Sequence, residues 1–182
     1  AGNDHRLGAN EAPPAIVSIF LGDELTEILK SIENDTSYIC KEKSPMEIGV
    51  RVLPKFFKDT TDRNRTSPFA FTGNKFEFRM LGSAFSIAGA NTIVAEELSQ
   101  FADILENSSN FDEDLNTLIK NTIKSHNKII FNGNNYSNDW VKEAEKRGLL
   151  NLKTTPDALP SFVNSKNVEL FTKHHVLSET EL

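Results

Sequence analysis

A short run of alternating charged and aromatic residues carries the clearest chemical pattern in the sequence. Lys75, Glu77 and Arg79 alternate with Phe76 and Phe78. Alternate side chains of an extended strand point to the same face, so this spacing predicts two cations and one carboxylate in a row, about 7 Å apart. Arginine and lysine bind phosphate oxygens, and a carboxylate binds a divalent cation. The pattern alone fits a joint anion and metal site, but it also fits the solvated outer face of an amphipathic strand, which commonly shows this alternation.

More basic residues precede this row. Arg63 and Arg65 follow Asp62, and segment 62–79 is net positive in a chain whose formal net charge is -6. The planar guanidinium fork of arginine donates two parallel hydrogen bonds to a phosphate or a carboxylate. The segment is therefore a candidate site for an anionic ligand, with mutual ion pairs on a solvated face as the alternative.

A second pattern lies near the start of the chain, where Arg6 and Glu11 precede Pro13 and Pro14. The prolines place Glu11 in extended or turn backbone rather than in a helix. A carboxylate on a rigid loop can act as a general base or stabilise a cation. An ordinary charged loop has the same composition, so both interpretations stay open for this motif alone.

Taken in order, these motifs resemble the signatures of type III glutamine synthetases. The resemblance rests on Arg6-Leu7 followed by Glu11-Ala12-Pro13, then on Asn64-Arg65, and then on Lys75-Phe76-Glu77-Phe78-Arg79. These match the family's Arg-Leu…Glu-Ala-Pro, Asn-Arg and basic-x-Glu-x-Arg signatures. Ile130-Phe131-Asn132-Gly133 and residues 153–160 also resemble the type III branch. The likeness covers nearly the whole chain.

The resemblance implies an enzyme that uses ATP to join ammonia to glutamate through a γ-glutamyl phosphate. By the same resemblance, Arg6 and Arg79 bind carboxylate groups of the substrate glutamate. Glu11 is implied to be catalytic, because it would bind ammonium and remove its proton. The implied substrates are thus glutamate, ammonia and ATP.

The other roles implied by the family concern phosphates and metal. Arg65 would be catalytic and would stabilise the phosphates of ATP and of γ-glutamyl phosphate, while Lys75 would contact the nucleotide phosphates. Glu77 would ligate Mg2+ or Mn2+. This interpretation requires five side chains to point into one cavity: Lys75, Glu77, Arg79, Arg65 and Glu11. One departure from the pattern is Ala70, which stands where shorter members of the family carry another arginine.

The family places its other metal-binding glutamates, its metal-binding histidine and its glutamate-binding loop upstream of these motifs. The sequence also has no initiator Met. We therefore expect a segment of a longer protein that holds part of the active site and is inactive alone. The resemblance implies a large ring-shaped homo-oligomer for the whole enzyme. A non-catalytic assembly or binding module and a phosphagen-kinase-like phosphotransferase are the alternatives.

The composition of the chain argues against nucleic-acid-binding, disulfide-linked and membrane-spanning proteins. A sequence pI of about 5.3 disfavours a general nucleic-acid binder. The single cysteine, Cys40, cannot form an internal disulfide, which points to a reducing compartment. The longest apolar run, residues 12–21, is about half of the ~20 residues that a membrane-spanning helix needs. A cytoplasmic protein without a membrane or nucleic-acid partner is expected.

The elements that must position these motifs differ between the two halves of the chain. Up to about residue 92 the pattern is strand-like, with a short strand at Val50–Leu53 and one helix at Asp23–Lys30. From Ser86 the apolar residues recur at helical spacing, first to Leu105 and then over residues 112–130.

Two more helices are predicted downstream. One runs from Ser137 to a C-terminal cap at Gly148, and one from Ser165 to His174, with Thr155 capping a short turn between them. The predicted fold is α+β: a partial antiparallel sheet, of the glutamine synthetase/guanido kinase type by resemblance, followed by a helical unit. We expect residues 1–109, with an insertion near 23–62, to belong to the catalytic domain and residues 110–182 to form a helical extension.

Overall fold

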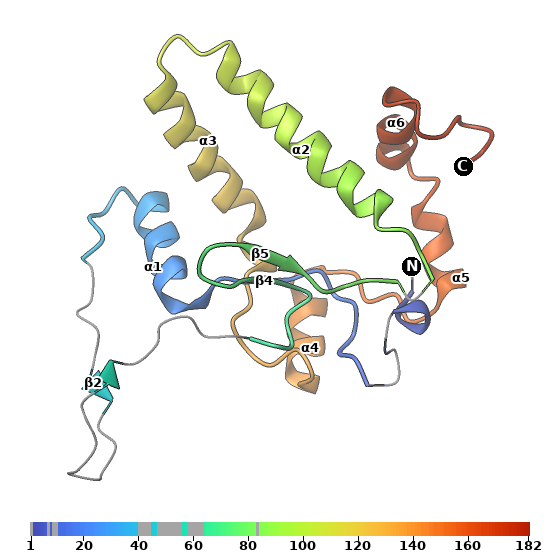
Figure 1. Cartoon of the computed structure of the whole chain (residues 1–182), viewed down its shortest axis with the longest axis horizontal. Coiled ribbons are helices and arrows are strands. Elements are labelled where there is room, and N and C mark those ends of the chain that lie inside the picture. The colour runs from blue at the N-terminus through green and yellow to red at the C-terminus, as the bar shows by residue number, and fades with distance from the viewer. Residues whose placement is uncertain are drawn as a thin grey trace.

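The chain folds as the predicted α+β arrangement, with a small sheet at the centre and helices around it (Figure 1). The structure, a computed structural model, describes residues 2–6, 8, 11–39, 45–46, 56–57, 64–82 and 84–182. The predicted strand at Val50–Leu53, and also Cys40, Asp62 and Arg63, lie outside the described residues.

The central sheet has three strands in the order β1-β4-β5. These are β1 (Ile19–Phe20), β4 (Phe69–Phe71) and β5 (Phe76–Phe78). The β4–β5 pair is antiparallel, as predicted, whereas β1 runs parallel to β4. A parallel neighbour needs a long crossover, which the chain between β1 and β4 supplies. A separate antiparallel pair consists of β2 (Pro45–Met46) and β3 (Phe56–Phe57).

A tight turn between β4 and β5 precedes the row of charged residues Lys75, Glu77 and Arg79. The backbone N–H of Thr72 donates to the carbonyl of Lys75 at 2.8 Å. Gly73 has a φ of +93°, which lies in a region that residues with a side chain rarely adopt. The turn therefore fixes the register in which Glu77 pairs with Ala70 across the strands.

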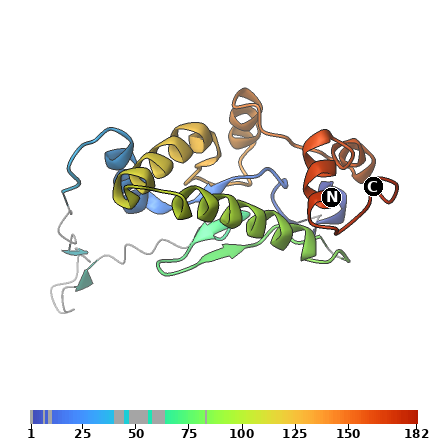
Figure 2. The ribbon, with the colours of Figure 1, turned by 90° about the horizontal axis from the view of Figure 1, so that it is seen from above.

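The predicted helices are present, with boundaries that differ by a few residues. They are α1 (Gly22–Glu33), α2 (Ala88–Glu106), α3 (Phe111–His126), α4 (Asn138–Lys146), α5 (Thr155–Ala158) and α6 (Ser165–Lys173). Three short 3-10 helices complete the described elements: η1 (Asn3–His5), η2 (Asn127–Ile129) and η3 (Leu159–Ser161). In Figure 1, α2 and α3 form a long hairpin and α1 lies beside α3, with which it is in contact. Seen from above, α5 and α6 gather near both termini (Figure 2).

Helix caps explain where the downstream helices begin and end. Ser137 accepts a hydrogen bond from the backbone N–H of Asp139, and Gly148 ends α4 with a φ of +69°, both as predicted. The predicted cap of α5 is wrong by one residue, because Thr154 rather than Thr155 caps it. Thr154 and Asp157 form a reciprocal capping box, in which each side chain accepts from the backbone N–H of the other residue.

The core lies between the segment leading into β1 and helix α4. Ile16, Trp140 and Ala144 are buried together, and Phe131 packs against them. The rings of Phe131 and Trp140 stack with their centroids 3.9 Å apart. Ile130 also forms an isolated parallel β-bridge to Ile19 of β1, so the segment before α4 pairs with the edge of the central sheet.

An ion-pair cluster around the buried carboxylate of Glu96 joins α2 to the end of α6. The carboxylate of Glu96 accepts from Lys173 at 2.7 Å and from Gln100 at 2.9 Å, and it also contacts the ring of His174. Glu96 is only 8% exposed. The ring of His174 is partly exposed, and its partner Glu96 comes from a helix far away in the sequence.

The contribution of this cluster to stability is expected to depend on pH. Hydrogen bonds from Lys173, Gln100 and His174 lower the pKa of Glu96 from 4.5 to about 2. Because folding lowers the pKa of Glu96, its carboxylate stabilises the fold at pH values above the ordinary pKa of 4.5. This stabilisation is lost as the pH falls from 4.5 towards about 2. We expect Glu96→Gln to lower the urea midpoint at neutral pH, with a difference from wild type that shrinks over that window. Glu97→Gln, on the exposed side of the same helix, is the control; an equal effect of both substitutions at all pH values would contradict the prediction.

In the described part of the chain, no helix combines the length and the apolar character that crossing a bilayer requires.

Candidate phosphate-binding site

A hollow of about 460 Å³ lies beside β5 and the turn that precedes it. Its lining consists of polar and charged side chains: Arg65, Thr72, Asn74, Lys75, Glu77 and Arg79. Four of the residues singled out from the sequence therefore meet in one place: Arg65, which precedes β4, and Lys75, Glu77 and Arg79 at β5. The alternation of strand β5 puts Lys75, Glu77 and Arg79 on this side, while Phe76 and Phe78 pack against Phe69.

Glu77 is the centre of the ion pairs in this hollow. Its carboxylate accepts from the guanidinium of Arg79 at 2.7 Å, and the ammonium of Lys75 lies 3.8 Å away. Arg79 also donates to the backbone carbonyl of Asn64. The side chain of Lys75 is 67% exposed and that of Arg79 only 25%. Lys75 is thus more open to a ligand than Arg79, which is held in place from two sides.

The donors of the hollow fit a phosphate group. Arg65, Lys75 and Arg79 supply three positive charges against the one carboxylate of Glu77. Charge-assisted hydrogen bonds from such groups are the strong contacts by which proteins hold phosphate oxygens. Thr72 and Asn74 add polar groups at the rim. The hollow can therefore hold a strongly anionic ligand in the presence of one acid.

The same residues do not make a complete metal site. Mg2+ prefers about six oxygen ligands in octahedral order. No cluster of three or more histidine, cysteine, aspartate or glutamate side chains suited to a metal occurs within the described ranges. Glu77 can contribute one ligand, and its carboxylate is already engaged by Arg79. A tightly bound ion would need ligands from outside this set.

Arg6 lies in a different environment from the hollow. It is 8% exposed, and its guanidinium donates to the backbone carbonyl of Pro13. Burial lowers the pKa of the Arg6 guanidinium. An antiparallel bridge joins Arg6 to Gly82, three residues after Arg79, so the first motif and the charged row are neighbours in the fold.

Glu11 is exposed on a turn, and its backbone N–H donates to the carbonyl of Gly8 at 2.8 Å. The sequence predicted that Glu11 would share one cavity with the other charged residues, but neither Glu11 nor Arg6 lines the hollow. The hydrogen bond of Arg6 to Pro13 explains the difference for Arg6, because it directs the guanidinium into its own loop.

The loop that carries Arg6 and Glu11 is held by the C-terminal half of the chain. The side-chain oxygen of Asn3 accepts from the backbone N–H of Ala15 at 2.7 Å, and its amide donates to Asn151 at 2.9 Å. The backbone N–H of Asn3 donates to the carbonyl of Leu152 at 3.0 Å. Sequence reasoning missed this clamp, because its partners are far apart in the chain.

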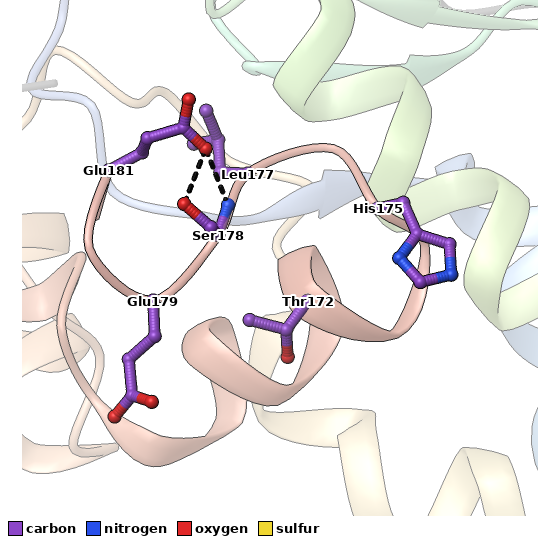
Figure 3. Close-up of a pocket in the computed structure, with 6 residues that line it drawn as sticks. All are labelled: Thr172, His175, Leu177, Ser178, Glu179 and Glu181. Carbon is purple, nitrogen blue, oxygen red and sulfur yellow. Dashed lines mark hydrogen bonds between the residues drawn. The ribbon is translucent and has the colours of Figure 1, made fainter.

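Another hollow, of about 420 Å³, lies at the C-terminal tail (Figure 3). Its lining comprises Thr172, His175, Leu177, Ser178, Glu179 and Glu181. Glu181 accepts from the backbone N–H and the hydroxyl of Ser178, which lower the pKa of its carboxyl. In the close-up, His175 lies at the right and Glu179 at the lower left, well apart from each other. The acids and the histidine of this hollow therefore do not converge on one ligand.

Comparison with known proteins identifies the relatives of this chain. Residues 114–182 match the glutamine synthetase C-terminal domain. Over its entire length the chain is 48% identical to a type-3 glutamine synthetase of Dictyostelium discoideum, of which the match covers 26%. This chain is a relative of the glutamine synthetases. The resemblance inferred from the motifs is thereby confirmed.

Two bacterial glutamine synthetases support the same conclusion. The protein of Butyrivibrio fibrisolvens is 44% identical, and that of Bacteroides fragilis 41%, each over 100% of this chain. The match covers 27% of the first and 26% of the second, so the chain spans about a quarter of the length of the curated relatives it matches.

Proposed function

We propose that this chain supplies the phosphate-binding part of the active site of an ATP-dependent glutamate–ammonia ligase. The observation that carries the proposal is the hollow in which Arg65, Lys75 and Arg79 surround a single carboxylate. The names of the relatives and their full coverage of the chain support this reaction rather than another use of a phosphate site. The domain division at residues 109 and 110 stays a prediction.

In the proposed reaction, the γ-carboxylate of glutamate attacks the γ-phosphorus of ATP and the bond to ADP breaks. Ammonia then attacks the acyl carbon of γ-glutamyl phosphate, and inorganic phosphate leaves with the bonding electrons. Negative charge develops on the phosphoryl and leaving oxygens, where fixed cations are most effective. Arg65 and Lys75 are proposed to bind these oxygens. A divalent ion would offset further phosphate charge when it is bound.

Arg79 is proposed to hold a glutamate carboxylate close to the transferred phosphoryl group. Its guanidinium already donates to Glu77 and to the carbonyl of Asn64, so it is preorganised at the edge of the hollow. Glu77 is proposed as one ligand of Mg2+ or Mn2+, with the others from elsewhere in a longer protein. Ligation would compete with the ion pair to Arg79.

Glu11 and Arg6 are proposed to serve the second half-reaction. Glu11 has an exposed carboxylate on a loop clamped by Asn3, which suits a group that binds ammonium and takes up its proton. Arg6 is buried on the same loop and is proposed to bind a glutamate carboxylate with the N–H groups not used on Pro13. A cytoplasmic location and a homo-oligomer belong to the same proposal.

The 182-residue chain alone is expected to form no γ-glutamyl hydroxamate in a transfer assay with glutamine, hydroxylamine, ADP and Mn2+. The reason is that its described residues offer one carboxylate, Glu77, where the ion needs several ligands. Full-length protein at the same concentration is the control. Turnover of the chain at the full-length rate would contradict this expectation.

The product separates this proposal from its alternatives. A ligase forms glutamine from glutamate, ammonia and ATP, whereas a phosphagen-kinase-like enzyme phosphorylates a guanidino substrate. A full-length protein with neither activity would support a non-catalytic assembly role.

A further inference from the structure

A hydroxyl group links the hollow to the helical half of the chain. The side chain of Thr66 donates to the side-chain oxygen of Asn64 at 2.7 Å. The backbone N–H of Asn135 donates to the same Thr66 hydroxyl oxygen at 3.0 Å. One hydroxyl thus joins two segments that are 69 residues apart in the sequence.

Asn135, the partner of Thr66 in this link, is buried and hydrogen-bonded on its other side. It is 0% exposed, and its side-chain amide donates to the hydroxyl of Ser18 at 2.9 Å. Ser18 is itself buried directly before β1. A second hydrogen bond joins the same two segments: the side-chain amide of Asn64 donates to the carbonyl of Gly133 at 2.7 Å. Buried polar groups joined in this way resist displacement, since breaking the link leaves them unsatisfied.

Asn64 in turn sets the position of two arginines. Arg65 is the next residue in the chain, and Arg79 donates from its guanidinium to the backbone carbonyl of Asn64. A shift of Asn64 would therefore move the backbone of Arg65. It would also move the carbonyl that accepts the hydrogen bond from Arg79. Both arginines line the hollow, whereas Thr66 does not.

We propose that Thr66 is a positioning residue for the ligase reaction: its hydroxyl, held by Asn135, fixes Asn64 and through it Arg65 and Arg79. The inference rests on the proposed function. Misplacement of catalytic groups by about 1 Å can lower a rate by about 100-fold, although binding of the ground state is less affected. Loss of the hydroxyl should therefore reduce kcat more than it changes KM.

The test compares Thr66→Val with Thr66→Ser in the full-length enzyme. Valine keeps the shape of threonine without the hydroxyl, and serine keeps the hydroxyl without the methyl group. We expect Thr66→Val to lower kcat by about 10- to 100-fold, with KM for ATP and glutamate changed less than about threefold. Thr66→Ser should stay within about threefold of wild type. Rates are normalised to folded protein measured by circular dichroism.

Ser18→Ala is a second test variant, whose kcat and KM are measured in case Thr66→Val does not fold. It removes the acceptor of Asn135 without touching the hollow, and a smaller loss of kcat at unchanged KM is expected. Wild-type kcat in folded Thr66→Val, or equal losses in Thr66→Val and Thr66→Ser, would overturn the inference. If Thr66→Val does not fold, wild-type kcat in Ser18→Ala would overturn it.

Arg65→Ala separates this outcome from failure of the proposed function. If Arg65→Ala abolishes glutamine formation while Thr66→Val is fully active, the positioning role is wrong and the proposed function stands. If Arg65→Ala is as active as wild type, the proposed site itself is wrong.

Discussion

Substitution of Arg65 by alanine is expected to lower kcat for glutamine formation by the full-length protein about 100- to 1,000-fold. Arg65 lines the hollow and would face the phosphoryl oxygens on which negative charge grows during transfer. Removal of one preorganised donor to such a charge commonly has an effect of this size. Coupled-assay kinetics at saturating ATP, glutamate and ammonia measure it.

Two controls make this result specific. Arg65→Lys keeps the charge but loses the guanidinium fork, so an intermediate kcat is expected. Lys124→Ala removes an exposed cation from α3, far along the chain from the hollow, and should leave kcat unchanged. Equal losses in Arg65→Ala and Lys124→Ala would show that the effect is one of general charge.

Substitution of Trp140 by alanine is expected to lower the free energy of unfolding of the chain by about 3–5 kcal/mol. Trp140 is 1% exposed, stacks on Phe131 and lies beside Ile16, so its removal opens a large cavity. The guanidinium of Arg147 also lies 5.5 Å from the centre of its ring. Urea denaturation followed by circular dichroism measures the change.

Trp140→Phe and Leu150→Ala are the matched controls for this prediction. The buried indole N–H of Trp140 has no acceptor among the described residues, so phenylalanine loses volume but no hydrogen bond. A cost of about 1–2 kcal/mol is expected for it. Leu150 is 67% exposed, and its truncation should change stability by less than about 0.5 kcal/mol. A Trp140→Ala effect as small as that of Leu150→Ala would contradict the assigned core.

The helices could be predicted from the sequence because their determinants are local. Apolar spacing marked α2 and α3, and the caps at Ser137 and Gly148 marked α4. The cap of α5 was misplaced by one residue, since both Thr154 and Thr155 can cap and only the reciprocal bond to Asp157 selects between them. The parallel pairing of β1 with β4 could not be predicted, because it depends on a crossover rather than on a turn.

The site was predictable only in part, for the same reason. Period-two spacing placed Lys75, Glu77 and Arg79 together, and their meeting in one hollow with Arg65 matches that expectation. The position of Glu11 outside the hollow, and the link through Thr66 and Asn135, depend on contacts between distant segments. No local pattern contains that information.

The most direct test of the account is a structure of the full-length protein with ATP and a divalent cation bound. We predict that the phosphate groups lie in the hollow beside β5, in contact with Arg65 and Lys75, while the Asn64 carbonyl still accepts from Arg79. Phosphates bound elsewhere, with the hollow open to solvent, would contradict it.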